Sequence, residues 1–111
     1  MMHELSLTQN LLDVALKNAA GRRIMHVNLS IGEFSDERKD AIQFYWDDLA
    51  KGTNAEAAQL HFQLMVAEAK CLDCETVFHP EDGATFCPKC RNHRLKLIRG
   101  DDVQLESIDV E

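Results

Sequence analysis

Four cysteines arranged in two pairs carry the clearest chemistry in this chain. The pairs are Cys71-Leu-Asp-Cys74 and Cys87-Pro-Lys-Cys90, and twelve residues separate them. Two C-x-x-C turns can present four thiolates to one tetrahedral metal ion, and Zn²⁺ is the usual occupant. Four protein ligands leave no open position for a substrate, so the predicted site is structural. A disulfide framework is the alternative, which a reducing compartment would disfavour.

A second group that could bind metal lies at the amino terminus, which reads Met1-Met2-His3-Glu4. The α-amine, the intervening amide nitrogens and the imidazole of His3 can chelate one ion in fused rings. Such nitrogen donors favour square-planar Ni²⁺ or Cu²⁺. A disordered terminal histidine with no ligand role is the alternative. Glu4 has two possible roles: it could turn toward the metal, or complement the dipole of the first helix.

Four other histidines are weaker candidates. His79 and His93 are close to the cysteine pairs, where they could tune the zinc site or lend a ligand during transfer. Solvated loop histidines are the favoured interpretation for both. His26 and His61 alternate with apolar residues in expected strands, so we predict that they are surface residues.

Basic residues around the second cysteine pair raise a rival interpretation, a zinc ribbon that binds nucleic acid or another protein. They are Lys89, Arg91, Arg94, Lys96 and Arg99. The net charge of −7 argues against general affinity for nucleic acid or anionic membranes. The ribbon also lacks a clear set of aromatics for base stacking, because Phe78 and Phe86 are expected to form its small core. We therefore expect neither nucleic acid nor a membrane as partner.

Regular elements that would position these residues can be predicted from apolar periodicity. Helices are expected at 5–20 and 36–51, and strands at 25–31, 60–64, 95–98 and 103–110. Ser6 and Gln9 fit a capping box, which would start the first helix near Ser6. Ser35 or Asp36 is the expected cap of the second helix.

The order of these elements predicts an α+β fold with a three-stranded sheet, two helices and an inserted zinc ribbon. We assign 1–68 and 100–111 to a nickel-binding α+β domain and 69–99 to the zinc-ribbon domain. The apolar parity of the last strand changes between Leu105 and Ile108, which predicts a bulge or a change of the exposed face. No secretion signal or transmembrane run is visible, so a cytoplasmic location is expected. A nucleotide motif and an activated nucleophile are also missing, so we do not expect an enzyme.

Several segments taken together resemble the HypA/HybF family of hydrogenase nickel-insertion proteins. The resemblance covers the whole length, and its specific parts are the opening Met-His-Glu and the two cysteine pairs. The supporting segments are Met2-His3-Glu4-Leu5-Ser6-Leu7, Ile31-Gly32-Glu33-Phe34-Ser35 and Gly52-Thr53-Asn54-Ala55-Glu56-Ala57.

This resemblance implies a nickel metallochaperone for [NiFe]-hydrogenase maturation. By position, nickel would bind at Met2, His3 and Glu4, with His3 as the central ligand. Zinc would bind at Cys71, Cys74, Cys87 and Cys90. Family members work with the GTPase HypB, deliver nickel to the hydrogenase large subunit, and in some cases also serve urease.

The chain departs from the family at its first residue. The family motif starts at residue 1, whereas here Met1 precedes it. We expect the native chain to start at Met2, which would restore the family motif. A retained Met1 would still allow a square-planar complex through two intervening amides, but with a different donor set.

Overall fold

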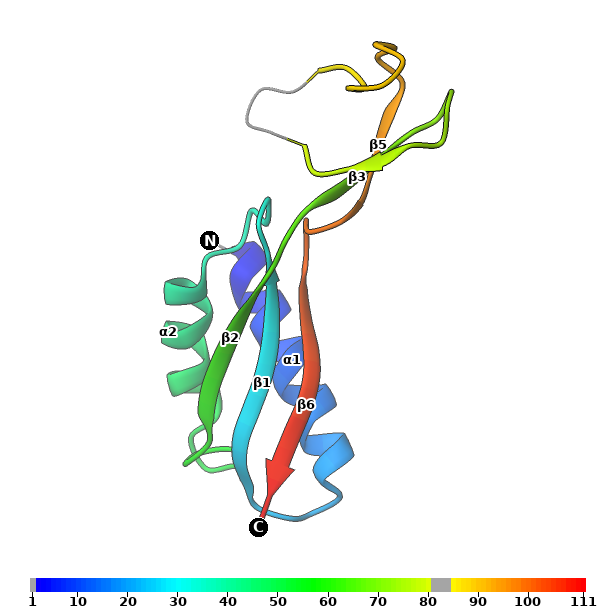
Figure 1. The fold of residues 1–111 in the computed structure, drawn as a ribbon. Coiled ribbons are helices and arrows are strands. Elements are labelled where there is room, and N and C mark those ends of the chain that lie inside the picture. Colours follow the sequence, from blue (N-terminus) through cyan, green and yellow to red (C-terminus); the bar gives the residue numbers. More distant parts are fainter. Residues whose placement is uncertain (1, 81–84) are drawn as a thin grey trace.

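The computed structural model describes residues 2–80 and 85–111, except for the side chain of Met2. Met1, on which the expected donor set depends, lies outside the described residues. The elements are α1 (Met2–Ala19), β1 (Ile24–Gly32), α2 (Lys39–Leu49), β2 (Gln59–Met65), β3 (Glu68–Cys71), β4 (Val77–Phe78), β5 (Leu95–Arg99) and β6 (Val103–Val110). Figure 1 shows a body formed by the helices with β2, β1 and β6, and a smaller ribbon at one end. The molecule is elongated, with extents of 54 × 26 × 16 Å.

The body sheet has the strand order β2-β1-β6. β1 pairs with β2 in parallel and with β6 antiparallel. A parallel pair needs a crossover connection, which α2 supplies. The ribbon has its own sheet, in the order β4-β3-β5, and its strands fall between β2 and β6 in the sequence. The predicted α+β fold with an inserted ribbon is confirmed.

Two bulges adjust the register of β1 against β6. Leu29 pairs with Leu105 but Asn28 pairs with Ser107, so Glu106 is the extra residue. This is the bulge that the sequence predicted between Leu105 and Ile108. A second irregularity lies at Met25, between the pairs Ile24–Val110 and His26–Asp109. It makes Ile24 the buried residue and leaves Met25 half-buried.

The first helix begins earlier than predicted. α1 starts at Met2, so the capping box at Ser6 was wrong. Ser6 is exposed, and the Gln9 side chain donates to Asp13 instead of turning back toward Ser6. The buried hydroxyl of Thr8 donates to the Glu4 carbonyl at 2.6 Å, within the first turns. The opening Met-His-Glu segment is therefore helical.

The second helix also begins later than predicted. α2 starts at Lys39 with Arg38 at the N-cap position, and no side chain among the described residues caps it. Ser35, one of the two predicted caps, uses its hydroxyl to accept the N–H of Glu37 at 3.0 Å. The Arg38 N–H donates instead to the Glu4 carboxylate at 3.0 Å. A tertiary contact thus holds the N-cap residue itself, while no side chain among the described residues caps the first turn of α2.

One hydrophobic core lies between the sheet and the helices of the body. Its largest buried members are Leu12 from α1, Ile24, Val27 and Leu29 from β1, and Ile42 and Trp46 from α2. Leu60 and Phe62 of β2 pack against this core, but Leu64 is 62 % exposed. Leu64 lies near the end of β2, where the chain leaves the body for the ribbon.

A narrow neck joins the body to the ribbon. A side chain at Gly32 would overlap the backbone of Gly100, and one at Gly100 would overlap Ala67. Gly100 also has φ +98°, which favours glycine. Backbone hydrogen bonds from Gly32 to Asp102 and from Phe34 to Gly100 close the neck at 2.8 and 2.7 Å. Close backbone approach thus fixes the place where both ribbon connections leave the body. Among the described residues, no helix is long and apolar enough to cross a membrane.

Candidate metal-binding sites

The two cysteine pairs form matched turns at the far end of the ribbon. In the first, the amides of Asp73 and Cys74 donate to the Cys71 sulfur at 3.4 and 3.5 Å. In the second, the amides of Lys89 and Cys90 donate to the Cys87 sulfur at the same two distances. Such bonds stabilise negative charge on sulfur, which prepares each turn to hold a thiolate.

The backbone that follows each cysteine pair also has the same conformation in the two turns. Glu75 and Arg91, which follow the second cysteine of each turn, have φ of 64° and 68°. Their amides donate to the carbonyls of Cys71 and Cys87, both at 2.9 Å. A left-handed conformation at a non-glycine residue costs roughly 1–2 kcal/mol. Two such residues at equivalent places indicate turns that are shaped by a common requirement, the aiming of two sulfurs at one point.

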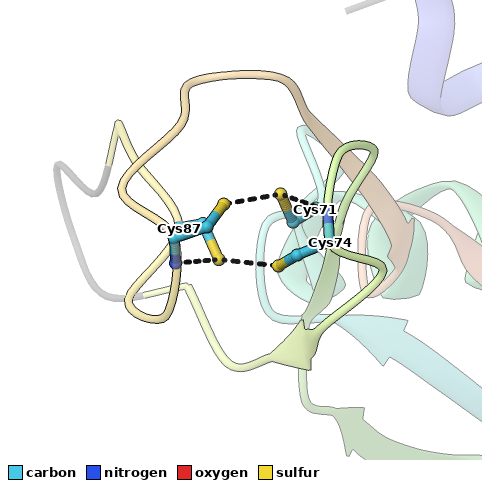
Figure 2. Close-up of side chains that lie close together, drawn as sticks. Cys71, Cys74 and Cys87 are labelled. Atoms are coloured by element: carbon cyan, nitrogen blue, oxygen red, sulfur yellow. Dashed lines mark hydrogen bonds between the residues drawn. The ribbon is translucent and has the colours of Figure 1, made fainter.

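The four sulfur atoms converge within 4.8 Å of one another. Cys71 and Cys90 are 3.5 Å apart at sulfur, and Cys74 and Cys87 are 3.6 Å apart. Figure 2 shows Cys71 and Cys74 from one turn facing Cys87 from the other. Sulfurs bound to tetrahedral zinc at about 2.3 Å lie roughly 3.8 Å from each other. The donor set and its spacing fit a structural zinc site.

Acidity within the cluster is unequal. The Thr76 hydroxyl and backbone N–H lower the pKa of Cys74 to about 6. At Cys90 the backbone N–H of Asn92 also lowers the pKa, but burial and the neighbouring thiols outweigh it and raise the pKa to about 12. Close thiols share their protons, so the first is lost easily and the last with difficulty. Thiolates that have lost their protons repel one another, and a divalent cation that displaces these protons would offset that repulsion.

Apart from the cysteines, the ribbon has little core. Cys71 and Cys87 are fully buried. Phe78 is half-buried, but Phe86 is 44 % exposed, so its expected place in a small core was wrong. The Phe86 ring instead contacts the imidazole of His93 edge-on, with centroids 6.5 Å apart.

At the other candidate site, α1 brings His3 to the loop before α2. The His3 Nε2 lies 2.9 Å from a carboxylate oxygen of Glu37. The His3 side chain is 70 % exposed, whereas that of Glu37 is 11 % exposed. His3, Glu4, Asp36 and Glu37 line one surface depression. An accessible imidazole beside a fixed carboxylate can offer a nitrogen and an oxygen donor to one cation.

Glu4 is buried, with 6 % exposure, and its carboxylate accepts the Arg38 N–H. Neither of the roles predicted for Glu4 describes this contact, which joins the first turn of α1 to the loop that carries Glu37. Glu4 is positioned to hold His3 and Glu37 together.

Among the described residues, none of the remaining histidines belongs to the four-cysteine cluster or lines the depression at His3. The His79 Nε2 lies 2.9 Å from Glu33, at the neck. The His93 Nδ1 lies 2.7 Å from the Thr85 carbonyl, in the ribbon. His26 and His61 lie on the body sheet and contact each other.

Sequence reasoning missed the carboxylates of Glu33 and Glu37. No local pattern identifies Glu37 as a neighbour of His3, because the two are linked only by the packing of α1 against the loop. Glu33 lies within the Ile31–Ser35 segment, which was noted for its resemblance but was given no role.

Much of the basic character of the ribbon is engaged within the ribbon. Arg94 pairs with Asp73 at 2.6 Å, and Arg99 pairs with Glu68 at 2.8 Å. The Arg91 guanidinium lies 5.9 Å from the centre of the Phe86 ring. These contacts occupy three of the cations that raised the nucleic-acid interpretation.

Comparisons with known proteins agree with this arrangement. A family model described as "Hydrogenase/urease nickel incorporation, metallochaperone, hypA" matches residues 2–110. Hydrogenase maturation factor HypA of Geobacter sulfurreducens is 34% identical over 110 residues, covering 99% of this chain and 100% of that protein. HypA of Aeromonas hydrophila is 38% identical over 112 residues, covering 98% and 99%.

Solved structures share the fold. The solution structure of the Ni metallochaperone HypA from Helicobacter pylori superposes with a TM-score of 0.79 at 23% identity, covering 96% of each chain. A second HypA solution structure gives a TM-score of 0.81 at 24% identity, covering 100% of this chain and 98% of that one. From the match to the family model over nearly its full length, this chain belongs to the HypA family of hydrogenase and urease nickel-incorporation metallochaperones.

Proposed function

We propose that this protein captures Ni²⁺ at its amino-terminal end and delivers it during the maturation of [NiFe]-hydrogenase, with urease as a second recipient. His3 is the central nickel ligand. The observation that carries this proposal is the 2.9 Å approach of the exposed His3 imidazole to the Glu37 carboxylate. Together with the family membership, it supports a cation site at the start of α1.

The helical start of α1 bears on which donors hold nickel. The first N–H groups of a helix have no partner within the helix and point along its axis. They do not converge on one plane, so a chelate through amide nitrogens at Met2 and His3 requires the first turn to unwind. Side-chain binding through His3 and Glu37 leaves the helix intact. The proposal therefore has two forms, a square-planar amide complex and a side-chain complex completed by water.

Zinc has a separate role in this proposal. Cys71, Cys74, Cys87 and Cys90 hold one Zn²⁺ that organises the ribbon, and Ni²⁺ is cargo. We propose a division into a nickel-binding α+β domain, 1–68 with 100–111, and a zinc-ribbon domain, 69–99. The two units meet at the Gly32–Gly100 neck.

Delivery is proposed to involve a HypB-like GTPase and the hydrogenase large subunit, in the cytoplasm. The sequence has no nucleotide-binding motif. The outward side of α1 next to the nickel site is an accessible surface for such a partner. Its exposed residues near His3 include Ser6 and Asn10, and Val14 and Lys17 are exposed farther along the helix.

Replacement of His3 by alanine tests the nickel site directly. The His3→Ala protein should lose high-affinity nickel binding in a calorimetric titration, while keeping zinc and its circular dichroism spectrum. Cells that carry it should make immature hydrogenase, which excess nickel partly restores. His93→Ala is the matched control, because it also removes an exposed imidazole but lies in the ribbon. Unchanged nickel affinity in His3→Ala would contradict the proposal.

Glu37→Gln separates the two forms of the site. In the side-chain form, loss of the carboxylate should weaken nickel binding about 10–100-fold, by analogy with the loss of supporting groups at other metal sites. In the amide form, affinity should change little, and the complex should show the yellow, diamagnetic character of square-planar Ni²⁺. Absorption spectra of the nickel-loaded wild-type protein provide the independent measurement.

A further inference from the structure

The two histidines of the body sheet form a pair that the proposed function does not use. The Nδ1 of His26 and the Nε2 of His61 are 2.9 Å apart. Their rings are 5.0 Å apart at the centroids and inclined by 40°. His26 is on β1 and His61 on β2, strands that are adjacent and parallel in Figure 1. The pair is therefore built by the sheet rather than by neighbours in sequence.

Strand register places both imidazoles on the sheet face that points away from the core. Asn28 of β1 is the register partner of His61, and Gln59 of β2 is the partner of His26. The alternating residues Val27, Leu29, Leu60 and Phe62 belong to the core or pack against it. The opposite, polar face carries the histidine pair. Its exposed hydrogen bonds show that solvent reaches it, such as that from Asn28 to Ser107 at 3.0 Å.

The spacing of the two nitrogens matches the geometry of a cation site. Two nitrogen ligands at right angles on an ion, each at about 2.1 Å, lie roughly 3.0 Å apart. Imidazole is a good ligand for Ni²⁺, Cu²⁺ and Zn²⁺. A small rotation of each ring would turn both lone pairs from each other toward a shared ion. The backbone of the sheet would not need to move.

A carboxylate is also available next to the pair. Asp109 of β6 is directly opposite His26 in the register. Directly opposed residues of an antiparallel pair have Cβ atoms about 4.5–5.5 Å apart. Asp109 can therefore reach an ion held by His26 through a change of rotamer. In the described part of the chain, the side-chain contact seen at this place is the one between the two imidazoles.

We propose that His26 and His61 form a second, weaker binding site for Ni²⁺ on the open face of the body sheet. It is distinct from the site at His3. From His26 to Gly32, β1 runs about 20 Å at roughly 3.3 Å per residue. His3 contacts Glu37, which is in the loop that follows this end of β1. Two imidazoles with water and one optional carboxylate form an open site, which suits transient holding of the cargo.

A titration of the full-length, zinc-loaded His3→Ala protein with Ni²⁺ alone tests this site without the first one. We expect a residual weak binding event that His61→Gln abolishes and His93→Gln leaves unchanged. Glutamine already occupies positions 59 and 63 on the same strand face, so His61→Gln should preserve the fold. Asp109→Asn should weaken the event without abolishing it.

Histidine side-chain NMR signals identify the ligands in the same titration. The signals of His26 and His61 should change together and before those of His79 and His93. Equal residual binding with and without His61→Gln, or first changes at His79 or His93, would overturn the proposal. Failure of the proposed His3 site can be told apart from failure of this second site. If His3 is not a ligand, His3→Ala should bind Ni²⁺ as tightly as the wild-type protein, whatever the effect of His61→Gln.

Discussion

The body and the ribbon of this protein are stabilised by different means. In the body, Trp46, Leu12, Ile24, Leu29 and Ile42 are almost completely buried between the helices and one sheet. In the described part of the ribbon, Leu72, Val77 and Phe86 are exposed, at 45 %, 49 % and 44 %, and Phe78, Leu95 and Leu97 are only half-buried. The buried residues of this part of the ribbon are Cys71 and Cys87, at 0 % exposure, with the small Ala69 and Pro80.

This difference bears on how the two metals can act. A segment of about thirty residues is too small to fold on a hydrophobic core alone, so the metal must supply the missing free energy. The body has its own core, and the first turn of α1 with His3 is held to the body through the buried Glu4 carboxylate, which accepts the Arg38 N–H. Nickel capture at His3 should therefore be independent of whether the ribbon is loaded with zinc.

Removal of zinc is the most direct test of this difference between body and ribbon, and it should have the largest effect on the folding of the ribbon. Structural zinc supplies about 10–16 kcal/mol of binding free energy in small zinc modules. Cys87→Ser should abolish zinc binding and unfold β3, β4 and β5, while β1, β2 and β6 stay folded. Amide hydrogen exchange, read strand by strand, is the measurement. Leu72→Ser is the control, because it changes an exposed residue within a cysteine turn and should keep zinc. Equal loss of protection in both sheets of Cys87→Ser would show that the body depends on the metal.

A cavity in the body should have the opposite consequence. Leu12 is 2 % exposed and lies within the core, so Leu12→Ala should lower the free energy of unfolding of the body by about 2–5 kcal/mol. Zinc content should remain at one ion per chain. Leu64→Ala removes the same atoms from a side chain that is 62 % exposed, and should change stability little. Denaturant unfolding checks both variants. Release of zinc from Leu12→Ala at low denaturant would mean that the two parts unfold as one unit.

Features that depend on residues close together in the sequence could be predicted from local sequence patterns. The spacing of Cys71, Cys74, Cys87 and Cys90 predicted a four-sulfur cluster, because a C-x-x-C turn aims both of its sulfurs the same way. Apolar alternation predicted the strands of the body, and its change of parity after Leu105 located a bulge. These features depend on neighbours a few residues apart.

Contacts between distant segments were beyond such patterns. The start of α1 at Met2 and the late start of α2 both involve the Glu4 carboxylate, which accepts the N–H of a residue thirty-four positions away. A capping box at Ser6 was a sound local expectation, but the chain is already helical from Met2. The same packing brings Glu37 to His3, and strand register brings His26 to His61. No periodic pattern in the sequence predicts either of these two contacts.

Glu33 at the neck sharpens the comparison, because it is where the two parts meet. Its carboxylate accepts the Ala67 N–H at 2.9 Å and lies 2.9 Å from the His79 imidazole. The Ala67 N–H, followed by the His79 contact, lowers the pKa of Glu33 below its usual value of 4.5. A lowered pKa means that the stabilisation is complete above the usual pKa and is lost as the pH falls through the lowered one.

Glu33→Gln should therefore loosen the neck slightly at neutral pH, the smallest of the expected effects because the carboxylate is partly exposed. The Ala67 amide should exchange faster than in the wild-type protein at pH 7, and this difference should vanish once acid protonates Glu33. Acid also competes with zinc for the thiolates. Zinc content, measured at each pH, separates loss of the metal from protonation of Glu33. His79→Gln should reproduce part of the effect at neutral pH, because it removes one of the two partners of Glu33. If the Ala67 amide exchanges at the same rate in Glu33→Gln and in the wild-type protein at pH 7, Glu33 does not stabilise the neck. The close backbone packing of Gly32, Gly100 and Ala67 would then hold the ribbon to the body.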